Sequence, residues 1–290
     1  MNILTFDIEE WYLEKILHGG RAFRFKQFDE TFDKLLEFLN EKGVKATFFC
    51  VGKLATDFPS VVKKISENGH EVGCHSNEHT WLNKMTEKQL REDTVEAIKA
   101  LEDVSGQKIV SYRAPAFSIT SENKWAVSVL AECGIVNDAS IFPSTRDFGG
   151  YKGFPQDTPC NIIFEGAKLH EYPISLTSVM GKRLAYSGGG YFRLLPLWFV
   201  SKTMSKRDYN ICYFHLNDLI NQRIGFKSKS EYEEYFKEPG TLKNRIVRYA
   251  KSNIGNSQAY EKFIKLVSSH DFSSIRDCGF DWDTANIINL

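Results

Sequence analysis

The sequence has no excess of charge of either sign. It contains 37 lysines and arginines and 37 aspartates and glutamates, so the formal net charge at pH 7 is zero. Proteins that bind nucleic acid or anionic membranes through their overall charge carry a basic surplus. The balance therefore gives no support for a nucleic-acid partner, while a local basic patch is compatible with it.

The sequence also lacks a long apolar run and closely spaced cysteines. The chain passes from Met1 directly into acidic residues, without the basic start and apolar stretch of a signal peptide or the length of a membrane span. The six cysteines form no Cys-x-x-Cys pair, which favours reduced thiols over a disulfide framework or a thiolate zinc site. We expect a cytoplasmic protein without an integral membrane segment.

The length and composition are those of an ordinary globular protein. The 290 residues are 42% hydrophobic and 26% charged, which allows a sizeable core. A second domain would have to begin near 221–240, where polarity rises without a low-complexity linker. We expect one domain over residues 1–290, with a C-terminal helical extension at about 241–290.

Apolar residues alternate between strand-like and helix-like spacing. Strands are predicted at 2–7, 44–51, 70–74, 108–112, 135–138, 162–164, 169–172 and 209–215, and helices at 28–42, 59–68, 86–104, 122–133 and 195–204. A long loop is predicted at 142–159, and a tight turn at the glycines 188–190. This alternation predicts an α/β barrel with parallel strands.

Five polar residues fall at the predicted carboxyl ends of strands. They are Asp7, His75, Arg113, Asp138 and His215. Active sites of parallel α/β proteins form at this edge of the sheet, where separated parts of the chain meet. Any one of these residues alone would be weak evidence, but five together predict a functional site.

His75 and His79 are four residues apart and follow a predicted strand. Two imidazoles with one carboxylate make a mixed nitrogen and oxygen site that suits zinc and leaves positions open for water and substrate. If the segment turns helically, both rings face the same side. Along the first strand, alternation places Asp7 and Glu9 on one side and directs Glu10 away from it.

The ordered motifs resemble the polysaccharide deacetylases of carbohydrate esterase family four, and most closely an intracellular branch associated with surface-polysaccharide and exopolysaccharide loci. The five matching segments are Thr5-Phe-Asp-Ile-Glu9, His75-Ser-Asn-Glu-His79, Arg113-Ala-Pro-Ala-Phe117, Asp138-Ala-Ser-Ile-Phe-Pro143 and Phe214-His215. Residues 188–196 are similar to a stretch typical of that branch. The resemblance covers most of the chain and implies a distorted (β/α)7 barrel.

The resemblance also implies different roles for two carboxylates. Asp7 would stay off the metal and take a proton from the water that attacks an amide carbonyl. The commonest family pattern has a second aspartate where Ile8 stands here, so Glu9 would complete the metal site with His75 and His79. Asp7 as the metal ligand is the alternative that stays open.

The remaining motifs resemble the groups that assist this reaction. Arg113 would hold Asp7 ionised, and the Ala116 N–H would donate to the developing oxyanion. His215 would protonate the leaving amine. Its imidazole would be held by Asp138 of the fourth motif or by Asp218, which stands where relatives often carry Pro-Trp-Glu.

The sequence thus predicts a metal-dependent N-deacetylase that removes acetate from an N-acetylated amino sugar in a surface-polysaccharide precursor. The cofactor would be a divalent metal, most simply zinc, with cobalt, nickel or manganese as alternatives. Two other functions stay open: hydrolysis of a small or cyclic amide, and sugar binding without catalysis, since the first and last motifs are altered. The sequence does not determine the sugar or the oligomeric state.

Overall fold

The computed structural model describes residues 1–290 except 146–148, 180, 223–224 and 237–238. Its main sheet has nine strands in the order β10-β1-β2-β3-β4-β5-β7-β6-β11. Their bounds are β1 (Asn2–Ile8), β2 (Thr47–Cys50), β3 (Glu71–Cys74), β4 (Ser111–Tyr112), β5 (Asn137–Asp138), β6 (Cys160–Phe164), β7 (Ala167–Glu171), β10 (Asn210–His215) and β11 (Asn286–Asn289). A separate hairpin consists of β8 (Leu176–Val179) and β9 (Lys182–Ala185).

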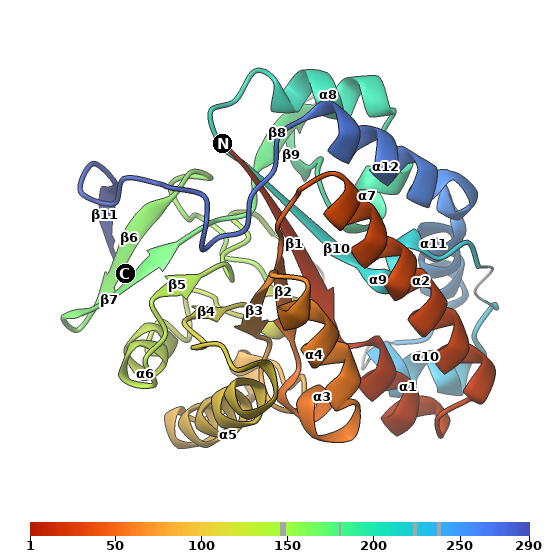
Figure 1. The fold of residues 1–290 in the computed structure, drawn as a ribbon, viewed down its shortest axis with the longest axis horizontal. Helices are drawn as coiled ribbons and strands as arrows, with labels where there is room; N and C mark the ends of the chain where they lie inside the picture. The colour runs from red at the N-terminus through yellow and green to blue at the C-terminus, as the bar shows by residue number, and fades with distance from the viewer. Residues whose placement is uncertain (146–148, 180, 223–224, 237–238) are drawn as a thin grey trace.

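Helices pack around the outer face of this sheet (Figure 1). The helices are α1 (Glu10–His18), α2 (Ala22–Glu41), α3 (Gly52–Asp57), α4 (Pro59–Glu67), α5 (Glu87–Ser105), α6 (Ala126–Glu132), α7 (Gly189–Leu194), α8 (Leu197–Met204), α9 (Leu216–Leu219), α10 (Lys229–Phe236), α11 (Leu242–Asn253) and α12 (Ala259–Ser269). The sheet is parallel except where β6 and β7 pair antiparallel. The architecture is the distorted (β/α)7 barrel that the sequence predicted. Among the described residues, no helix combines the length and hydropathy needed to cross a membrane.

Side chains of β1 alternate between two buried environments. Leu4, Phe6 and Ile8 belong to the core between sheet and helices, where Phe6 stacks on Phe48 with ring centroids 4.8 Å apart. Ile3 belongs to a second apolar cluster on the other face of the sheet. Burial on both faces is characteristic of parallel sheets. The same alternation directs Asp7 into the barrel interior at the end of β1.

Several element boundaries differ from the sequence prediction. The helix predicted at 28–42 begins six residues earlier, because its first turn is largely exposed and shows no apolar period. The strands predicted at 108–112 and 135–138 pair over their last residues only. The glycines 188–190 begin helix α7 instead of forming a separate tight turn.

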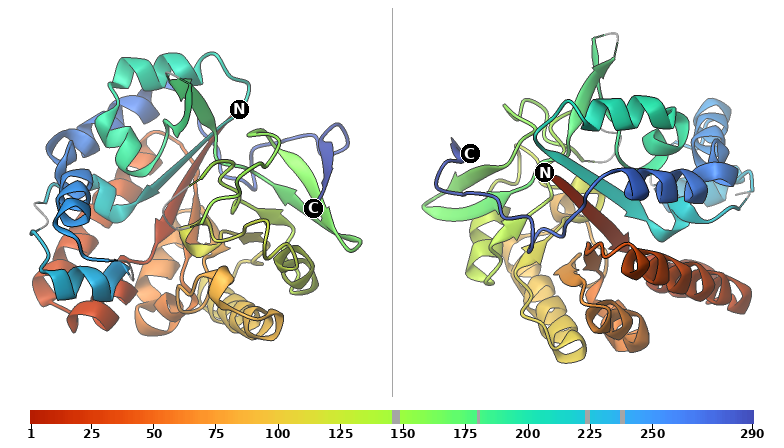
Figure 2. Two further views of the ribbon diagram at one scale, coloured as in Figure 1. Left: turned by 180° about the vertical axis from the view of Figure 1, so that it is seen from behind. Right: turned by 45° about the horizontal axis from the view of Figure 1, so that its top comes forward.

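The C-terminal extension is only partly helical. It contains α11 and α12, but the chain after Ser269 returns to the main sheet, where β11 pairs parallel to β6. Figure 2 shows this last segment on the side of the molecule opposite α10 and α11. Residues 241–290 therefore contribute helices and one edge strand of the main sheet, where the sequence predicted a helical extension.

Candidate active site

Parallel pairing aligns four strand ends at the candidate site. In the register of β1 and β10, Asp7 lies opposite His215. The last residue of β3 pairs with the last residue of β4, so His75 and Arg113 each follow a paired strand end. Ligands of parallel α/β folds bind at this edge. The sheet thus gathers residues that lie far apart in the chain, between Asp7 and His215.

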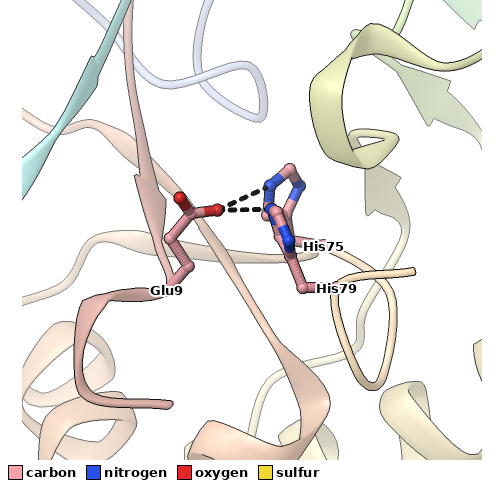
Figure 3. A group of neighbouring side chains, drawn as sticks. All are labelled: Glu9, His75 and His79. Atoms are coloured by element: carbon pink, nitrogen blue, oxygen red, sulfur yellow. Dashed lines mark ion pairs between the residues drawn. The ribbon is translucent and has the colours of Figure 1, made fainter. Parts of the chain in front are cut away.

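Glu9, His75 and His79 form a cluster with the dimensions of a metal site. One potential ligand atom from each lies within 4.8 Å of the others, and Figure 3 shows the carboxylate facing both rings. Glu9 Oε2 is 2.6 Å from His79 Nε2 and 3.6 Å from His75 Nε2. This oxygen is buried and accepts no hydrogen bond from the part of the chain that the structure describes. A divalent cation would satisfy it, since this donor set suits zinc.

The orientation of His75 is set by a backbone carbonyl. His75 Nδ1 is 2.7 Å from the carbonyl oxygen of Arg113. Because a carbonyl oxygen only accepts hydrogen bonds, Nδ1 carries a hydrogen, and in the neutral ring the lone pair is then on Nε2. Metal-binding histidines are typically held in this way by a second group. His75 is therefore oriented to offer Nε2 to the cluster.

The segment that carries the two histidines is a loop, so the expected helical alignment is wrong. Ser76 and His79 have left-handed backbone conformations, with φ of 65° and 57°. Asp93 of α5 holds the loop, because it accepts hydrogen bonds from Ser76 Oγ at 3.2 Å and from the Asn77 N–H at 2.9 Å. The turn brings the two imidazole centroids to 5.2 Å. No local signal in the sequence points to Asp93, which lies on a separate helix.

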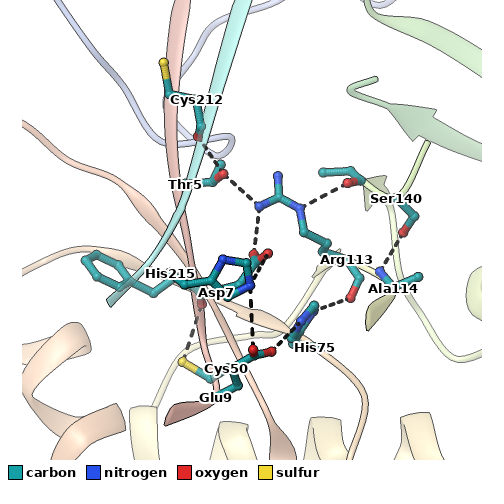
Figure 4. A network of polar contacts seen from close by, with 12 residues as sticks. Thr5, Asp7, Glu9, Cys50, His75, Arg113, Ala114, Ser140, Cys212 and His215 are labelled. Carbon is teal, nitrogen blue, oxygen red and sulfur yellow. Dashed lines mark hydrogen bonds and ion pairs between the residues drawn. The ribbon is translucent and has the colours of Figure 1, made fainter. Parts of the chain in front are cut away.

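Asp7 is paired with the buried Arg113, as Figure 4 shows. Arg113 Nη1 donates to Asp7 Oδ1 and to Thr5 Oγ1, each at 2.8 Å. The guanidinium lies over the Phe49 ring, 4.3 Å from its centroid. Burial opposes ionisation of Asp7, but the charges of Arg113, His75 and His215, with the hydrogen bond from Arg113, together outweigh it and lower the pKa of that carboxyl below its usual value. Asp7 is therefore an ionised carboxylate that can accept a proton.

His215 lies among three carboxylates. Its Nε2 is 3.6 Å from Glu9 Oε1 and 3.9 Å from Asp7 Oδ2, and its Nδ1 is 3.4 Å from Asp218 Oδ2. Asp218 also accepts a hydrogen bond from Arg193 at 2.6 Å. Burial disfavours the charged ring, but the charges of Glu9, Asp218 and Asp7 raise the pKa of His215 to about 10. This histidine is therefore protonated at neutral pH.

Asp138 is separate from His215. Its Oδ1 accepts a hydrogen bond from Ser140 at 2.5 Å, and its carboxyl neighbour is the buried Glu171. Burial raises the pKa of both carboxyls, and the charge of Asp138 raises that of Glu171 further. Of the two carboxylates considered as partners of His215, the structure pairs Asp218 with it. Asp218 lies in the first turn of α9, which His215 caps, and that local geometry decides the pairing.

The third motif contains a strained turn. Ala116 and Phe117 have φ of 55° and 54°, and left-handed conformations cost non-glycine residues about 1–2 kcal/mol each. The Gly150 N–H donates to the Phe117 carbonyl at 2.9 Å, and a Cβ on Gly149 would lie 2.5 Å from the Ala116 oxygen. Strain of this kind clusters at functional sites. The turn fixes the Ala116 N–H after the end of β4.

Glu10 lies inside the protein, although strand alternation predicted that it would face away. The strand ends at Ile8 and Glu9 becomes the N-cap of α1, so alternation no longer applies. The side chain of Glu10 is only 2% exposed. Asn217 donates its backbone N–H to Glu10 Oε1 at 2.8 Å. Burial raises the pKa of this carboxyl to about 7.

A cleft of about 770 Å³ adjoins the cluster at Glu9. It lies between the α1–α2 region and the segment that leads from α9 to α11. Its lining includes Arg21, Arg24, Asn217, Gln222, Lys227 and Arg248, together with the rings of Phe23, Phe28 and Phe226. Such a mixture of planar polar groups and aromatic rings can contact the hydroxyls and faces of a sugar.

Comparisons with known proteins find relatives for two parts of the chain. Residues 3–136 match the family model described as polysaccharide deacetylase, and residues 139–279 match a domain of unknown function, DUF3473. A peptidoglycan-N-acetylglucosamine deacetylase of Bacillus cereus is 35% identical over 131 residues, which are 45% of this chain and 45% of the relative. A chitooligosaccharide deacetylase of Azorhizobium caulinodans is 29% identical over 108 residues, which are 37% of this chain and 47% of the relative.

The fold is also found among solved structures. A Mycobacterium smegmatis protein assigned to the polysaccharide deacetylases superposes with a TM-score of 0.58 at 20% identity, covering 94% of this chain and 85% of that one. At this identity the likeness concerns the fold alone. The matches to the curated relatives span less than half of their length.

Proposed function

Because the chain belongs to the polysaccharide deacetylase superfamily, we propose that it is a metal-dependent N-deacetylase that removes acetate from an N-acetylated amino sugar. The observation that carries this proposal is the cluster of Glu9, His75 and His79 beside the ion-paired Asp7 and the protonated His215. We further propose that the sugar belongs to a precursor of a surface polysaccharide and that the reaction takes place in the cytoplasm. All six cysteines are free thiols, which agrees with a reducing compartment.

In this proposal Glu9, His75 and His79 would hold a divalent metal, most simply zinc. The buried Glu9 Oε2, which accepts no hydrogen bond within the described residues, fits such an ion. A bound metal would polarise the amide carbonyl and lower the pKa of water. Asp7 then serves as the base and not as a ligand, because both of its oxygens face other partners, Arg113 and His215.

In the proposed reaction, separate groups of the chain take up the proton, stabilise the oxyanion and protonate the leaving amine. Asp7 takes the proton of the attacking water, since Arg113 holds it ionised and fixed in place. The Ala116 N–H donates to the oxygen that gains negative charge. His215, held by Asp218, gives its proton to the departing amine, so that acetate and a free amino sugar leave.

Two departures from the family motifs favoured a sugar-binding protein without activity. At both places another side chain can take the role of the missing residue. Ile8 stands where a second aspartate is common, but the Glu9 side chain reaches the histidine cluster. The last motif lacks Pro-Trp-Glu, but Asp218 contacts the His215 imidazole. The roles of metal ligand and proton donor therefore each have a carboxylate that supports them, and this favours catalysis over sugar binding alone.

The proposal is tested by measuring acetate release from N-acetylamino sugars, including nucleotide-linked forms, lipid-linked forms and short oligosaccharides. Metal-stripped protein is resupplied with zinc, cobalt, nickel or manganese. We expect release from at least one substrate class and only after metal is restored. Sugar binding without acetate release from any substrate would refute the proposed enzyme activity and favour a binding protein. Hydrolysis of cyclic amides alone would indicate a different hydrolase.

A further inference from the structure

We propose that Glu10 is a positioning residue that fixes Glu9 relative to His215. This inference rests on the proposed function of those two residues, but it is drawn from contacts that the deacetylase motifs do not include. Glu10 is the first residue of α1 and follows the candidate metal ligand directly. The carboxylate is almost completely buried and contacts two separate helix ends.

Each oxygen of Glu10 accepts a hydrogen bond from a different part of the site. Oε2 accepts from the backbone N–H of Glu9 at 3.3 Å. Oε1 accepts from the backbone N–H of Asn217 at 2.8 Å. Asn217 lies in the first turn of α9, the helix that His215 caps. One carboxylate thus joins the N-cap of α1 to the first turn of α9.

A plain helix-stabilising role accounts for only part of this geometry. An acidic residue in the first turn of a helix typically interacts with the N–H groups and the dipole of its own helix. Glu10 instead reaches across to α9, where its partner Asn217 lies 207 residues later in the chain. Burying a carboxylate away from water is costly unless it is hydrogen-bonded. The hydrogen bond from the Asn217 N–H helps to offset the cost of burying Glu10, and it connects α1 to α9.

The Asn217 side chain restrains the same turn from a second direction. Arg24 of α2 donates from Nη2 to Asn217 Oδ1 at 2.9 Å, and Gln222 donates to the same oxygen at 3.1 Å. These bonds hold the side chain of Asn217, whereas Glu10 holds its backbone. Of the two restraints, the Glu10 bond leads directly to Glu9. Without the Glu10 carboxylate, the position of Glu9 relative to His215 should therefore be less well fixed.

The test compares Glu10→Ala, Glu10→Gln and the matched variant Glu14→Gln. Glu14 is a buried acid of the same helix, but its carboxylate accepts hydrogen bonds from Arg21 and lies 4.0 Å from Arg24 Nε. For each variant, zinc affinity is measured by chelator competition, Tm by circular dichroism, and kcat and KM by acetate release. Zinc affinity and Tm need no substrate, so they test the inference even if no deacetylation is found.

We expect Glu10→Ala to weaken zinc binding and to lower kcat by roughly tenfold or more, as losses of groups that orient metal ligands do, with KM nearly unchanged. Glu10→Gln should recover part of both losses, because its amide oxygen can accept the Asn217 N–H. Glu14→Gln should lower Tm but keep the zinc affinity. A folded Glu10→Ala protein with wild-type zinc affinity and kcat would overturn the inference.

If Glu10→Ala does not fold, Glu10→Gln decides the question. Weaker zinc binding at an unchanged Tm supports the positioning role. Wild-type zinc affinity and kcat in Glu10→Gln overturn it. If the wild-type protein releases no acetate from any substrate but Glu10→Gln still binds zinc more weakly, the proposed function fails while the link between Glu10 and the cluster stands.

Discussion

At the scale of single residues, Asp7 and Glu9 have different partners although they lie two positions apart. Asp7 is bound by Arg113, and Glu9 Oε2 faces two histidine nitrogens. Guanidinium groups are permanent hydrogen-bond donors, whereas neutral imidazole nitrogens can be metal ligands. The partners therefore favour Asp7 as the base and Glu9 as the ligand.

Replacement of Asp7 by asparagine tests this division. We expect Asp7→Asn to lower kcat by roughly 10²–10⁴-fold, the usual contribution of a general base, because the amide cannot take a proton. Bound zinc, measured by elemental analysis, and sugar affinity should stay at wild-type levels. Loss of zinc together with activity would favour Asp7 as the ligand, and full activity would exclude it as the base.

At the scale of elements, the contact between α7 and β10 supports the proton donor. Gly188 precedes α7 and forms a parallel bridge with Tyr213 of β10. A Cβ on Gly188 would lie 2.5 Å from the Tyr213 carbonyl oxygen, closer than carbon and oxygen normally approach. Because α7 also carries Arg193, which binds Asp218, this close approach helps to place the partner of His215.

Gly188→Ala should therefore damage both stability and catalysis. We expect a loss of about 1–3 kcal/mol in the free energy of unfolding, the usual cost of overpacking, together with a lower kcat. The measurements are denaturant unfolding and acetate release. Gly225→Ala is the stability control, because a Cβ at Gly225 meets no atom within 4 Å. Equal stability of the two variants would contradict the proposed close contact.

At the scale of the whole molecule, acid should weaken the barrel through a histidine outside the site. His70 directly precedes β3 and is fully buried, and its Nδ1 accepts the Ala46 N–H at 3.3 Å. Burial lowers the pKa of His70 to about 4. The unfolded chain, with a histidine pKa of about 6.5, binds this proton first as the pH falls. Stability is therefore lost between about pH 6.5 and 4 and is retained above that range.

The variant His70→Asn separates this effect from general acid denaturation. Its side-chain oxygen can accept the Ala46 N–H but does not titrate. We expect wild type to lose about 3 kcal/mol relative to the variant between pH 7 and 4, from the pKa difference of the folded and unfolded states. Urea unfolding at several pH values measures it. Parallel pH curves for the two proteins would show that His70 does not contribute.

The sequence predicted the barrel well where helices and strands have regular apolar spacing. The strand before His75 and the helix with the Thr86 capping box form close to their predicted bounds. Helix α1 was missed because it follows β1 without a turn residue. Strand β11 was missed because its apolar residues are few, and it exists through pairing with β6.

What the sequence determined by itself is the set of chemical groups and their order: an acid pair, two histidines, an arginine and a last histidine, each near the end of a strand. This follows because period-two and helical patterns are local. The tertiary structure alone decided which groups meet. The Asp93 support of the histidine loop, the choice of Asp218 over Asp138, and the inward position of Glu10 all depend on contacts between distant segments. Local patterns cannot encode such contacts, because they are set by how helices pack against the sheet.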